Sequence, residues 1–266
     1  EGRAAVGGTL DLFRYPGIRS DSDMHTLGYS FKPWTQAKSI ADGPSIRDYV
    51  NETADEFDIR RHIRFDHKVQ TASWDSTQSH WVLTNNLSDG STTKISGDFL
   101  FMCGGYYSYD DPHRPEFPGE SRYQGQVLHP QFWPEDLDYD GKKVIVIGSG
   151  ATAMTIVPSM TQKGAQVTMV QRSPTYVVSR PAEDKIANTL RKWLPEKWAY
   201  AITRLKNTTL SGYFYRQTRR QPAKTKAQLL GMATANLGEE MVKAHFTPSY
   251  NPWDQRMCLI PDGDLY

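Results

Sequence analysis

The stretch KVIVIGSGATA, residues 143–153, decides the fold of this chain. It opens with a short, β-branched apolar run, which is typical of a buried strand, and continues at once into a turn with two glycines. A helix-like stretch then runs to about Lys163, and the apolar run Gln166–Val170 predicts the next strand. Strand, glycine-rich turn, helix and strand in this order predict the β-α-β unit of an α/β protein with a parallel sheet.

The turn of this unit has the spacing G-x-G-x-x-G/A. Gly148 permits the tight bend, Gly150 lets backbone N–H groups approach a pyrophosphate, and Ala153 is small enough for close packing of the helix. This spacing indicates a dinucleotide site when a strand precedes it and a helix follows it, as predicted here. The alternative interpretation is a plain turn in which glycine is needed only for tightness.

The residues that follow the second strand indicate which dinucleotide binds. A carboxylate there would accept a hydrogen bond from the 2′-hydroxyl of a ribose, but the sequence has Gln171 and Arg172, followed by Ser173. The planar guanidinium of an arginine suits a phosphate group. NADPH is therefore favoured over NADH, and the alternative is that Arg172 is a solvated side chain with no ligand.

The composition excludes several classes of protein. The 31 Lys and Arg residues nearly balance the 30 Asp and Glu residues, so the charge of the chain gives no indication of a nucleic-acid partner. No apolar run reaches the roughly 18 to 20 residues of a membrane span. Cys103 and Cys258 form neither a disulfide framework nor a zinc motif, so we expect no metal and a reducing, cytoplasmic compartment. Because the chain begins at Glu1, we interpret it as part of a longer protein.

The sequence before this unit predicts a loop, a helix and several strands. Residues 7–44 lack periodicity and are rich in Gly, Pro and Asp, which indicates a long ordered loop. Ser45 begins an amphipathic helix that runs to about Asp58. The predicted strands are residues 63–69, 80–84, 92–95 and a buried strand over 99–103.

The segment of residues 181–245 is predicted to be helical and basic. Between Ala182 and Lys226 the sequence has 11 Lys and Arg residues against 3 Asp and Glu residues, together with several aromatic residues. Such a helix can lie on a membrane surface or contact nucleic acid. We favour a solvated helical insertion without a nucleic-acid partner, and peripheral association with a membrane is the second interpretation.

Two further segments resemble signatures of one family. Residues 7–21, GGTLDLFRYPGIRSD, resemble the pattern [AG]-G-x-W-x-x-x-x-[FY]-P-G-x-x-x-D, and residues 123–134, YQGQVLHPQFWP, resemble F-x-G-x-x-x-H-x-x-x-W-P. Both patterns belong to Baeyer–Villiger flavoprotein monooxygenases, and the chain is most similar to the ethionamide-activating members from actinobacteria. Leu10 stands where the family usually has Trp, and Tyr123 replaces the Phe of the second signature.

The resemblance implies an α/β fold with two Rossmann-like dinucleotide-binding domains, one for FAD and one for NADPH, both incomplete in this chain. It assigns residues 1–117 to the FAD-binding domain without its first β-α unit and residues 118–140 to a linker. Residues 141–180 and 246–266 form the NADPH-binding domain, and residues 181–245 form a helical insertion in it.

The resemblance also implies the site residues. Arg256 is the catalytic cation, and Asp21 orients it. The residues that would hold FAD are Glu1 at the ribose, Thr9, Leu10, Asp11, Leu12 and Asp21 along the cofactor, and Val69 by its main chain. The residues that would hold NADPH are Arg19, Ser20, Asp21, Gly148, Ser149, Gly150, Ala151, Thr152, Ala153, Met154, Gln171 and Arg172.

The implied reaction consumes NADPH and O2 and inserts one oxygen atom into a ketone, with oxygenation of sulfur in thioethers or thioamides as a further activity. A guanidinium suits the role of Arg256 because it keeps its charge at the working pH. His129 is interpreted as a hydrogen-bonded strut and not as a general base. Two alternatives remain: a flavin monooxygenase that acts only on nitrogen or sulfur, and a module that only binds NADPH.

Overall fold

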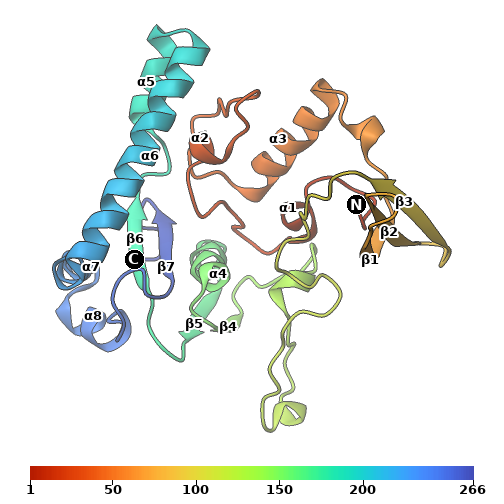
Figure 1. The fold of residues 1–266 in the computed structure, drawn as a ribbon. Helices are drawn as coiled ribbons and strands as arrows, with labels where there is room; N and C mark the ends of the chain where they lie inside the picture. The colour runs from red at the N-terminus through yellow and green to blue at the C-terminus, as the bar shows by residue number, and fades with distance from the viewer. The chain divides into compact units, whose positions relative to one another are not determined.

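The computed structural model describes residues 1–266 and shows a mixed α/β fold (Figure 1), which confirms the predicted class. The chain forms two compact units. Unit 1 consists of residues 1–14 and 44–133, and unit 2 of residues 15–43 and 134–266. Residues 15–43 therefore pack with the C-terminal half of the chain, and the cofactor that each part binds stays a prediction.

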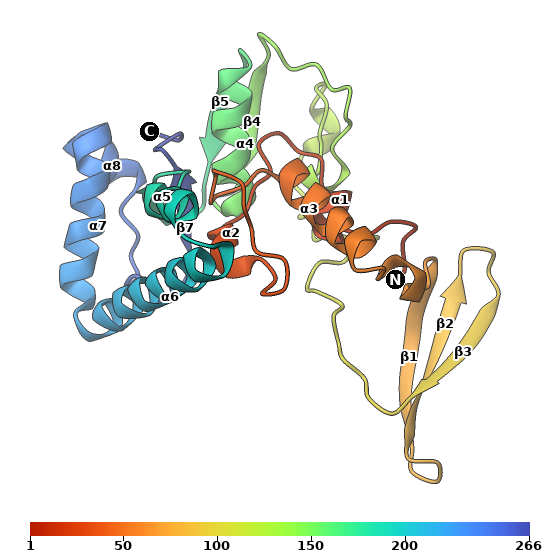
Figure 2. The same cartoon turned by 90° about the horizontal axis from the view of Figure 1, so that it is seen from above.

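Unit 1 contains a three-stranded antiparallel sheet, drawn as a twisted ribbon in Figure 2. Its strands are β1 (His67–Asp75), β2 (His80–Leu87) and β3 (Thr92–Gly97). The unit also has the short helix α1 (Thr9–Leu12), the helix α3 (Gly43–Glu56) and three 3₁₀ turns at Arg60–His62, Glu120–Arg122 and Pro130–Phe132. The helix predicted from Ser45 is thus present and begins two residues earlier.

The prediction of a buried strand over residues 99–103 was wrong. These residues form no strand, and the side chains of Phe99, Phe101 and Met102 are 82%, 77% and 77% exposed. An apolar run becomes a buried strand only when neighbouring strands pair with it and cover it. None of the strands in residues 1–266 pairs with this segment.

Unit 2 contains the predicted β-α-β unit. The strands β4 (Lys143–Ile147) and β5 (Gln166–Val170) pair in parallel, and the helix α4 (Ala151–Gln162) connects them. Both strands have the predicted bounds, and the helix ends one residue before Lys163. The order of strand, glycine-rich turn, helix and strand is confirmed.

A second parallel pair in unit 2 joins residues that are far apart in the sequence. The strands β6 (Tyr176–Arg180) and β7 (Met257–Pro261) pair in register from Tyr176 with Met257 to Arg180 with Pro261. A buried cluster of Met154, Val177, Cys258 and Ile260 joins these strands to α4. Burial of these side chains stabilises the attachment of the C-terminal segment to the glycine-rich turn.

The segment between β6 and β7 is helical, as predicted. It consists of α5 (Lys185–Trp193), α6 (Glu196–Arg220), α7 (Pro222–Leu237) and α8 (Glu239–His245). Helix α7 packs against β6, and α6 packs against α5, α7 and the short helix α2 (Met24–Leu27) of the loop 15–43 (Figures 1 and 2). No helix in residues 1–266 is both long and apolar enough to cross a membrane.

Candidate functional site

The glycine-rich turn has the geometry of a phosphate-binding turn. Gly148 has φ 143°, which favours glycine, and its N–H donates to the carbonyl oxygen of Val170 at 2.8 Å. Gly150 is the N-cap of α4, and a Cβ atom built on it would meet no other atom within 4 Å. The first N–H groups of a helix have no acceptor within the helix. The turn therefore leaves open space where the positive end of the helix dipole favours an anion.

Ser149 connects this turn to the predicted catalytic arginine. Its buried hydroxyl group donates to the carbonyl oxygen of Ser173 at 3.1 Å and accepts a hydrogen bond from Nη2 of Arg256 at 2.8 Å. The hydroxyl is therefore used both as donor and as acceptor. The structure thus brings Arg256 to the glycine-rich turn, although the two are 107 positions apart in the sequence.

Two residues that sequence reasoning missed hold the backbone of Arg256. The hydroxyl groups of Thr175 and Tyr250 donate to the carbonyl oxygen of Arg256 at 3.1 and 2.9 Å. The hydroxyl of Tyr176 donates to the carbonyl oxygen of Tyr250 at 2.6 Å. Burial, with smaller contributions from Tyr250 and Asp254, raises the pKa of Tyr176 to about 12, so it remains a donor at neutral pH. No sequence motif marks these contacts.

Arg19 and Asp21 lie in the same unit as Arg256, but neither forms a hydrogen bond or ion pair with it. Arg19 forms an ion pair with Asp264, a partner that sequence reasoning missed. Loss of hydration raises the pKa of the Asp21 carboxyl group, and the positive charge of Arg19 partly opposes this rise. No hydrogen bond or ion pair joins Asp21 to Arg256 anywhere in residues 1–266, so the orienting role of Asp21 stays a prediction.

The charges of both Asp21 and Arg256 affect the pKa of the Cys258 thiol. Burial raises its pKa, a hydrogen bond with Thr175 lowers it, and the charge of Asp21 raises it while that of Arg256 lowers it. Both predicted catalytic side chains therefore lie within electrostatic range of one buried atom. The structure brings them into the same region of unit 2 without pairing them.

The two residues predicted to bind the 2′-phosphate differ in their surroundings. Nε2 of Gln171 donates to the carbonyl oxygen of His245 at 2.7 Å, so this amide is engaged within the protein. Arg172 is exposed, and its guanidinium has no hydrogen bond or ion pair with the protein. Of the two, Arg172 is the side chain that is available to an anionic ligand.

The residues predicted to hold FAD gather in unit 1, except Asp21, which belongs to unit 2. The carbonyl oxygen of Glu1 accepts from the N–H of His67 at 2.9 Å, which places Glu1 beside the start of β1, two residues before Val69. Arg3 donates to the carbonyl oxygen of Gly8 at 3.0 Å and forms an ion pair with Asp11 at 2.7 Å. Glu1, Val69 and the α1 residues Thr9, Leu10, Asp11 and Leu12 therefore belong to one connected part of this unit.

His129 has the structural position expected of a strut. It is the N-cap of the 3₁₀ turn Pro130–Phe132, and its Nδ1 accepts from the N–H of Gln131 at 3.2 Å. Burial is the main cause that lowers its pKa. This nitrogen is therefore used within the linker.

The loop 15–43 approaches α4 closely at Gly17. This residue has φ 76°, and a Cβ atom built on it would lie 1.8 Å from Oγ of Ser159 and 3.1 Å from the carbonyl oxygen of Thr155. Only glycine fits this contact, because both the backbone conformation and the space exclude a side chain. The contact brings the segment with Arg19, Ser20 and Asp21 to the helix that starts at the glycine-rich turn.

These features agree with the comparisons to known proteins. Residues 37–222 match the model of the flavin-binding monooxygenase-like family. The match covers more than half of the chain, and the chain belongs to this family. The predicted relationship to flavoprotein monooxygenases is confirmed.

Among its relatives is the FAD-containing monooxygenase EthA of Mycolicibacterium smegmatis, 52% identical over 100% of this chain and 54% of EthA. The chain thus spans about half the length of the curated relatives it matches. A steroid monooxygenase solved with NADP has TM-score 0.79 at 23% identity, over 100% of this chain and 58% of that one. The OTEMO complex with FAD and NADP has TM-score 0.76 at 20% identity, over 99% and 57%.

The contact at Gly17 gives a prediction about stability. We expect Gly17→Ala to destabilise unit 2 by roughly 2 to 5 kcal/mol, since a strained φ and an overpacked contact add. The measurement is chemical denaturation. Gly231→Ala is the control, because Gly231 lies within α7 with nothing near its built Cβ, and alanine there should stabilise the helix by about 0.5 to 1 kcal/mol. Equal stability of the two variants would contradict the close approach.

Proposed function

We propose that the protein to which this chain belongs is a FAD- and NADPH-dependent monooxygenase that inserts one oxygen atom from O2 into a ketone. Oxygenation of sulfur in thioethers or thioamides is a second activity of the same site. The observation that carries the proposal is the hydrogen bond from Arg256 to Ser149 in the glycine-rich turn. It supports a site in which a permanent cation meets the bound nicotinamide nucleotide.

The residues at the turn fit NADP. The open space at Gly150 and the N–H groups at the start of α4 suit a pyrophosphate, and the exposed guanidinium of Arg172 suits the 2′-phosphate. The steroid monooxygenase neighbour contains NADP, and the OTEMO neighbour contains FAD and NADP. We assign Gly148–Met154, Gln171 and Arg172 to NADPH, and Glu1, Thr9–Leu12 and Val69 to FAD.

The overall reaction would convert ketone, O2, NADPH and a proton into ester, water and NADP⁺. The flavin, when bound, supplies the transfer of two electrons from NADPH and the activation of O2. The protein contributes the charge of Arg256, which stabilises the negative charge that develops on the reacting oxygen atoms. Thr175 and Tyr250 fix the backbone of Arg256, and Ser149 fixes one end of its guanidinium.

Two rival functions lead to different products. A flavin monooxygenase that oxygenates only nitrogen or sulfur would form no ester from a ketone. A module that only binds NADPH would purify without flavin even as the full-length protein. The placement of Arg256 at the turn favours the ketone monooxygenase, because attack on a carbonyl creates an oxyanion that needs a nearby cation.

The choice of nucleotide rests on Arg172. We expect Arg172→Ala in the full-length protein to weaken the use of NADPH by roughly 1.5 to 3 kcal/mol, the value of a charge-assisted hydrogen bond, and to leave the use of NADH almost unchanged. The measurement is kcat/KM with each nucleotide. An equal loss with both nucleotides would exclude contact with the 2′-phosphate.

The chemistry rests on Arg256. We expect the full-length Arg256→Ala variant to bind FAD normally and to lose about 10² to 10³ in the rate of ester formation, the usual effect of removing a group that stabilises transition-state charge. Arg256→Lys should restore little activity, because a point charge cannot reproduce the planar fork.

The assay for Arg256 follows the ester product together with NADPH consumption. Lys243→Ala is the matched control, since Lys243 is an exposed cation on α8. A normal rate of ester formation by Arg256→Ala would show that Arg256 has a structural role only.

We also infer that the outer face of α6 contacts an anionic membrane surface. Ala199 and Thr203 of this helix are buried, whereas Trp198, Ile202 and Leu205 form an exposed apolar stripe on another side of it, and Trp198 and Leu205 are 65% and 67% exposed. From Lys197 to Arg220 the helix has no acidic residue, and among its basic residues Lys197, Arg216 and Arg220 form no ion pair or hydrogen bond with another element. Apolar side chains beside cations suit the interface of a bilayer that contains anionic lipids.

The test of the membrane contact is co-sedimentation of the full-length protein with phosphatidylglycerol vesicles. We expect binding that weakens with added salt and is lost in the double variant Trp198→Gln with Leu205→Gln. Trp74→Gln, in the exposed sheet of unit 1, should bind like the wild type. If the wild type does not bind the vesicles, the membrane contact is excluded. If the double variant instead abolishes self-association, the stripe contacts protein and not lipid.

A further inference from the structure

The loop 15–43 is closed by hydrogen bonds between its two ends. The N–H of Met24 donates to the carbonyl oxygen of Ser39 at 2.8 Å, and the N–H of Ser20 donates to that of Ala41 at 2.8 Å. Residues 24–39 therefore form a closed loop, named here the clasp loop. The pairing continues beyond these ends, since Ser20 donates to Ala41 and Arg19 is bridged to Asp42, so the clasp loop is joined directly to the segment with Arg19 and Asp21.

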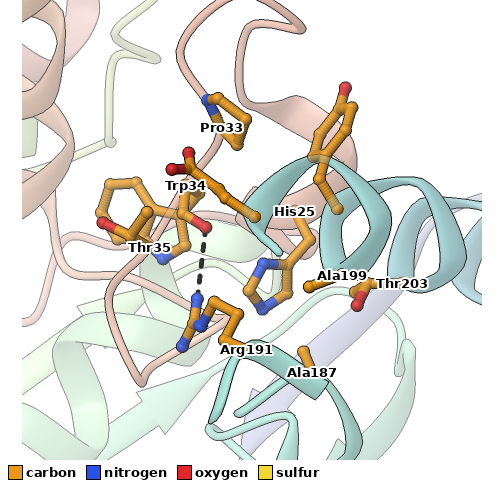
Figure 3. A pocket seen from close by; sticks show the side chains of 10 residues that line it. His25, Pro33, Trp34, Thr35, Ala187, Arg191, Ala199 and Thr203 are labelled. Carbon is orange, nitrogen blue, oxygen red and sulfur yellow. Dashed lines mark hydrogen bonds between the residues drawn. The ribbon is translucent and has the colours of Figure 1, made fainter. Parts of the chain in front are cut away.

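Helix α5 holds the clasp loop by its backbone. The guanidinium of Arg191 donates to the carbonyl oxygen of Trp34 at 3.2 Å (Figure 3). It also donates to that of Gln36 at 3.1 Å, and Asn188 donates to that of Ala37 at 3.2 Å. Arg191 also donates to Oδ1 of Asn188 at 2.5 Å, so the two donors support each other. A single arginine thus satisfies two carbonyl groups of a segment without regular structure.

Helix α6 holds the other end of the clasp loop. Arg204 donates to the carbonyl oxygen of Thr26 at 2.6 Å, and Asn207 donates to Oδ1 of Asp23 at 2.8 Å. The contacts of α5 and α6 together link the helical insertion to the segment that precedes the clasp loop. These contacts are polar, directional and formed mainly to main-chain atoms, so their geometry sets the position of the loop.

A cavity lies between the clasp loop and the two helices. Figure 3 shows His25, Trp34 and Arg191 around it, with Ala199 and Thr203 on the side of α6. Of the buried side-chain polar atoms without a partner in residues 1–266, two belong to residues that line this cavity, Nε2 of His25 and the hydroxyl of Tyr200. The side chain of His25 is only 4% exposed. The cavity between the clasp loop and the two helices is therefore lined by a buried, titratable imidazole that has one nitrogen without a hydrogen-bond partner.

We propose that Arg191 is a positioning residue that fixes the segment of Arg19 and Asp21 through the clasp loop, and that protonation of His25 releases this hold. The role of Arg191 in turnover rests on the function proposed above, because that function gives Arg19 and Asp21 their part in the site. The release by His25 depends only on the cavity and its contacts.

Burial and the charges around His25 together set the direction of the pH effect. Burial lowers the pKa of His25, the charge of Arg191 lowers it further, and Asp184, Asp23 and a hydrogen bond to the Trp34 backbone partly oppose this. Other charged or titratable groups on the facing helices are Glu196 and Tyr200, which line the cavity, Arg204 over the Tyr200 ring, and Lys206, paired with Asp184.

In the closed state Arg191 holds the clasp loop, and in the open state this hold is released. The closed state therefore binds a proton at His25 less well than the open state. In the open state His25 gains a proton near its ordinary pKa of 6.5. The closed state is therefore fully favoured above pH 6.5. Its stability relative to the open state decreases as the pH falls from 6.5 toward the lower pKa that His25 has in the closed state. For one proton the opening equilibrium rises by at most about tenfold per pH unit.

The first test is amide hydrogen exchange of residues 24–39 in the full-length protein, corrected for the intrinsic rate at each pH. We expect protection to fall below about pH 6.5 in the wild type, and His25→Gln to remove this dependence because glutamine does not titrate. We expect Arg191→Ala to lower protection about tenfold or more at neutral pH. Lys192→Ala, which removes the neighbouring exposed cation on α5, should match the wild type.

The same experiment can overturn the proposal. Unchanged protection in Arg191→Ala would remove the positioning role, and an acid-induced loss that persists in His25→Gln would remove the role of His25. Arg191→Lys covers the case in which the alanine variant does not fold. It keeps the charge but not the fork, so we expect protection between those of the wild type and Arg191→Ala.

The second test is turnover of the full-length enzyme. We expect Arg191→Ala to lower kcat and to move the acid limb of the kcat profile to higher pH, while His25→Gln flattens that limb. If the wild type consumes no NADPH, the proposed function fails and hydrogen exchange still decides the inference. If the wild type is active and Arg191→Ala keeps its kcat and its pH profile, the inference fails alone.

Discussion

The hydroxyl group of Ser149 is the point on which the candidate site of unit 2 depends. It donates to the carbonyl oxygen of Ser173 and accepts from Arg256, so one side chain joins the glycine-rich turn, the segment after β5 and the start of β7. Both its donor and its acceptor function are used in a buried place, where an unpaired polar group is costly. This constraint links the place where a nucleotide phosphate would bind to the cation assigned to catalysis.

The same unit shows how the loop 15–43, which has little regular structure, is given a defined position. Its backbone would lose hydrogen bonds on burial, and the side chains of α5 and α6 replace them at Trp34, Gln36 and Thr26. At the other end, Gly17 lets the loop touch α4 at a distance that no other residue permits. Through these contacts, the helical insertion positions the segment with Arg19 and Asp21.

Some of this could be read from the sequence because the signals are local. The strands β4 and β5 and the helix between them follow from the apolar runs and the glycine spacing within residues 143–170. The open space at Gly150 and the exposed Arg172 follow from their places in that unit. The same local reasoning was wrong for residues 99–103, because burial depends on which strands lie beside an apolar run.

By itself, then, the sequence determined the β-α-β unit, the nature of the turn and the family to which the chain belongs. Only the tertiary structure decided that Ser149 meets Arg256, that Asp264 pairs with Arg19, and that His25 and Tyr200 share a cavity. A hydroxyl or a guanidinium can bond to many partners, and the residue type does not specify which one. That choice depends on how distant elements pack, and the packing of α4 against β6 and β7 is what brings residues 149 and 256 together.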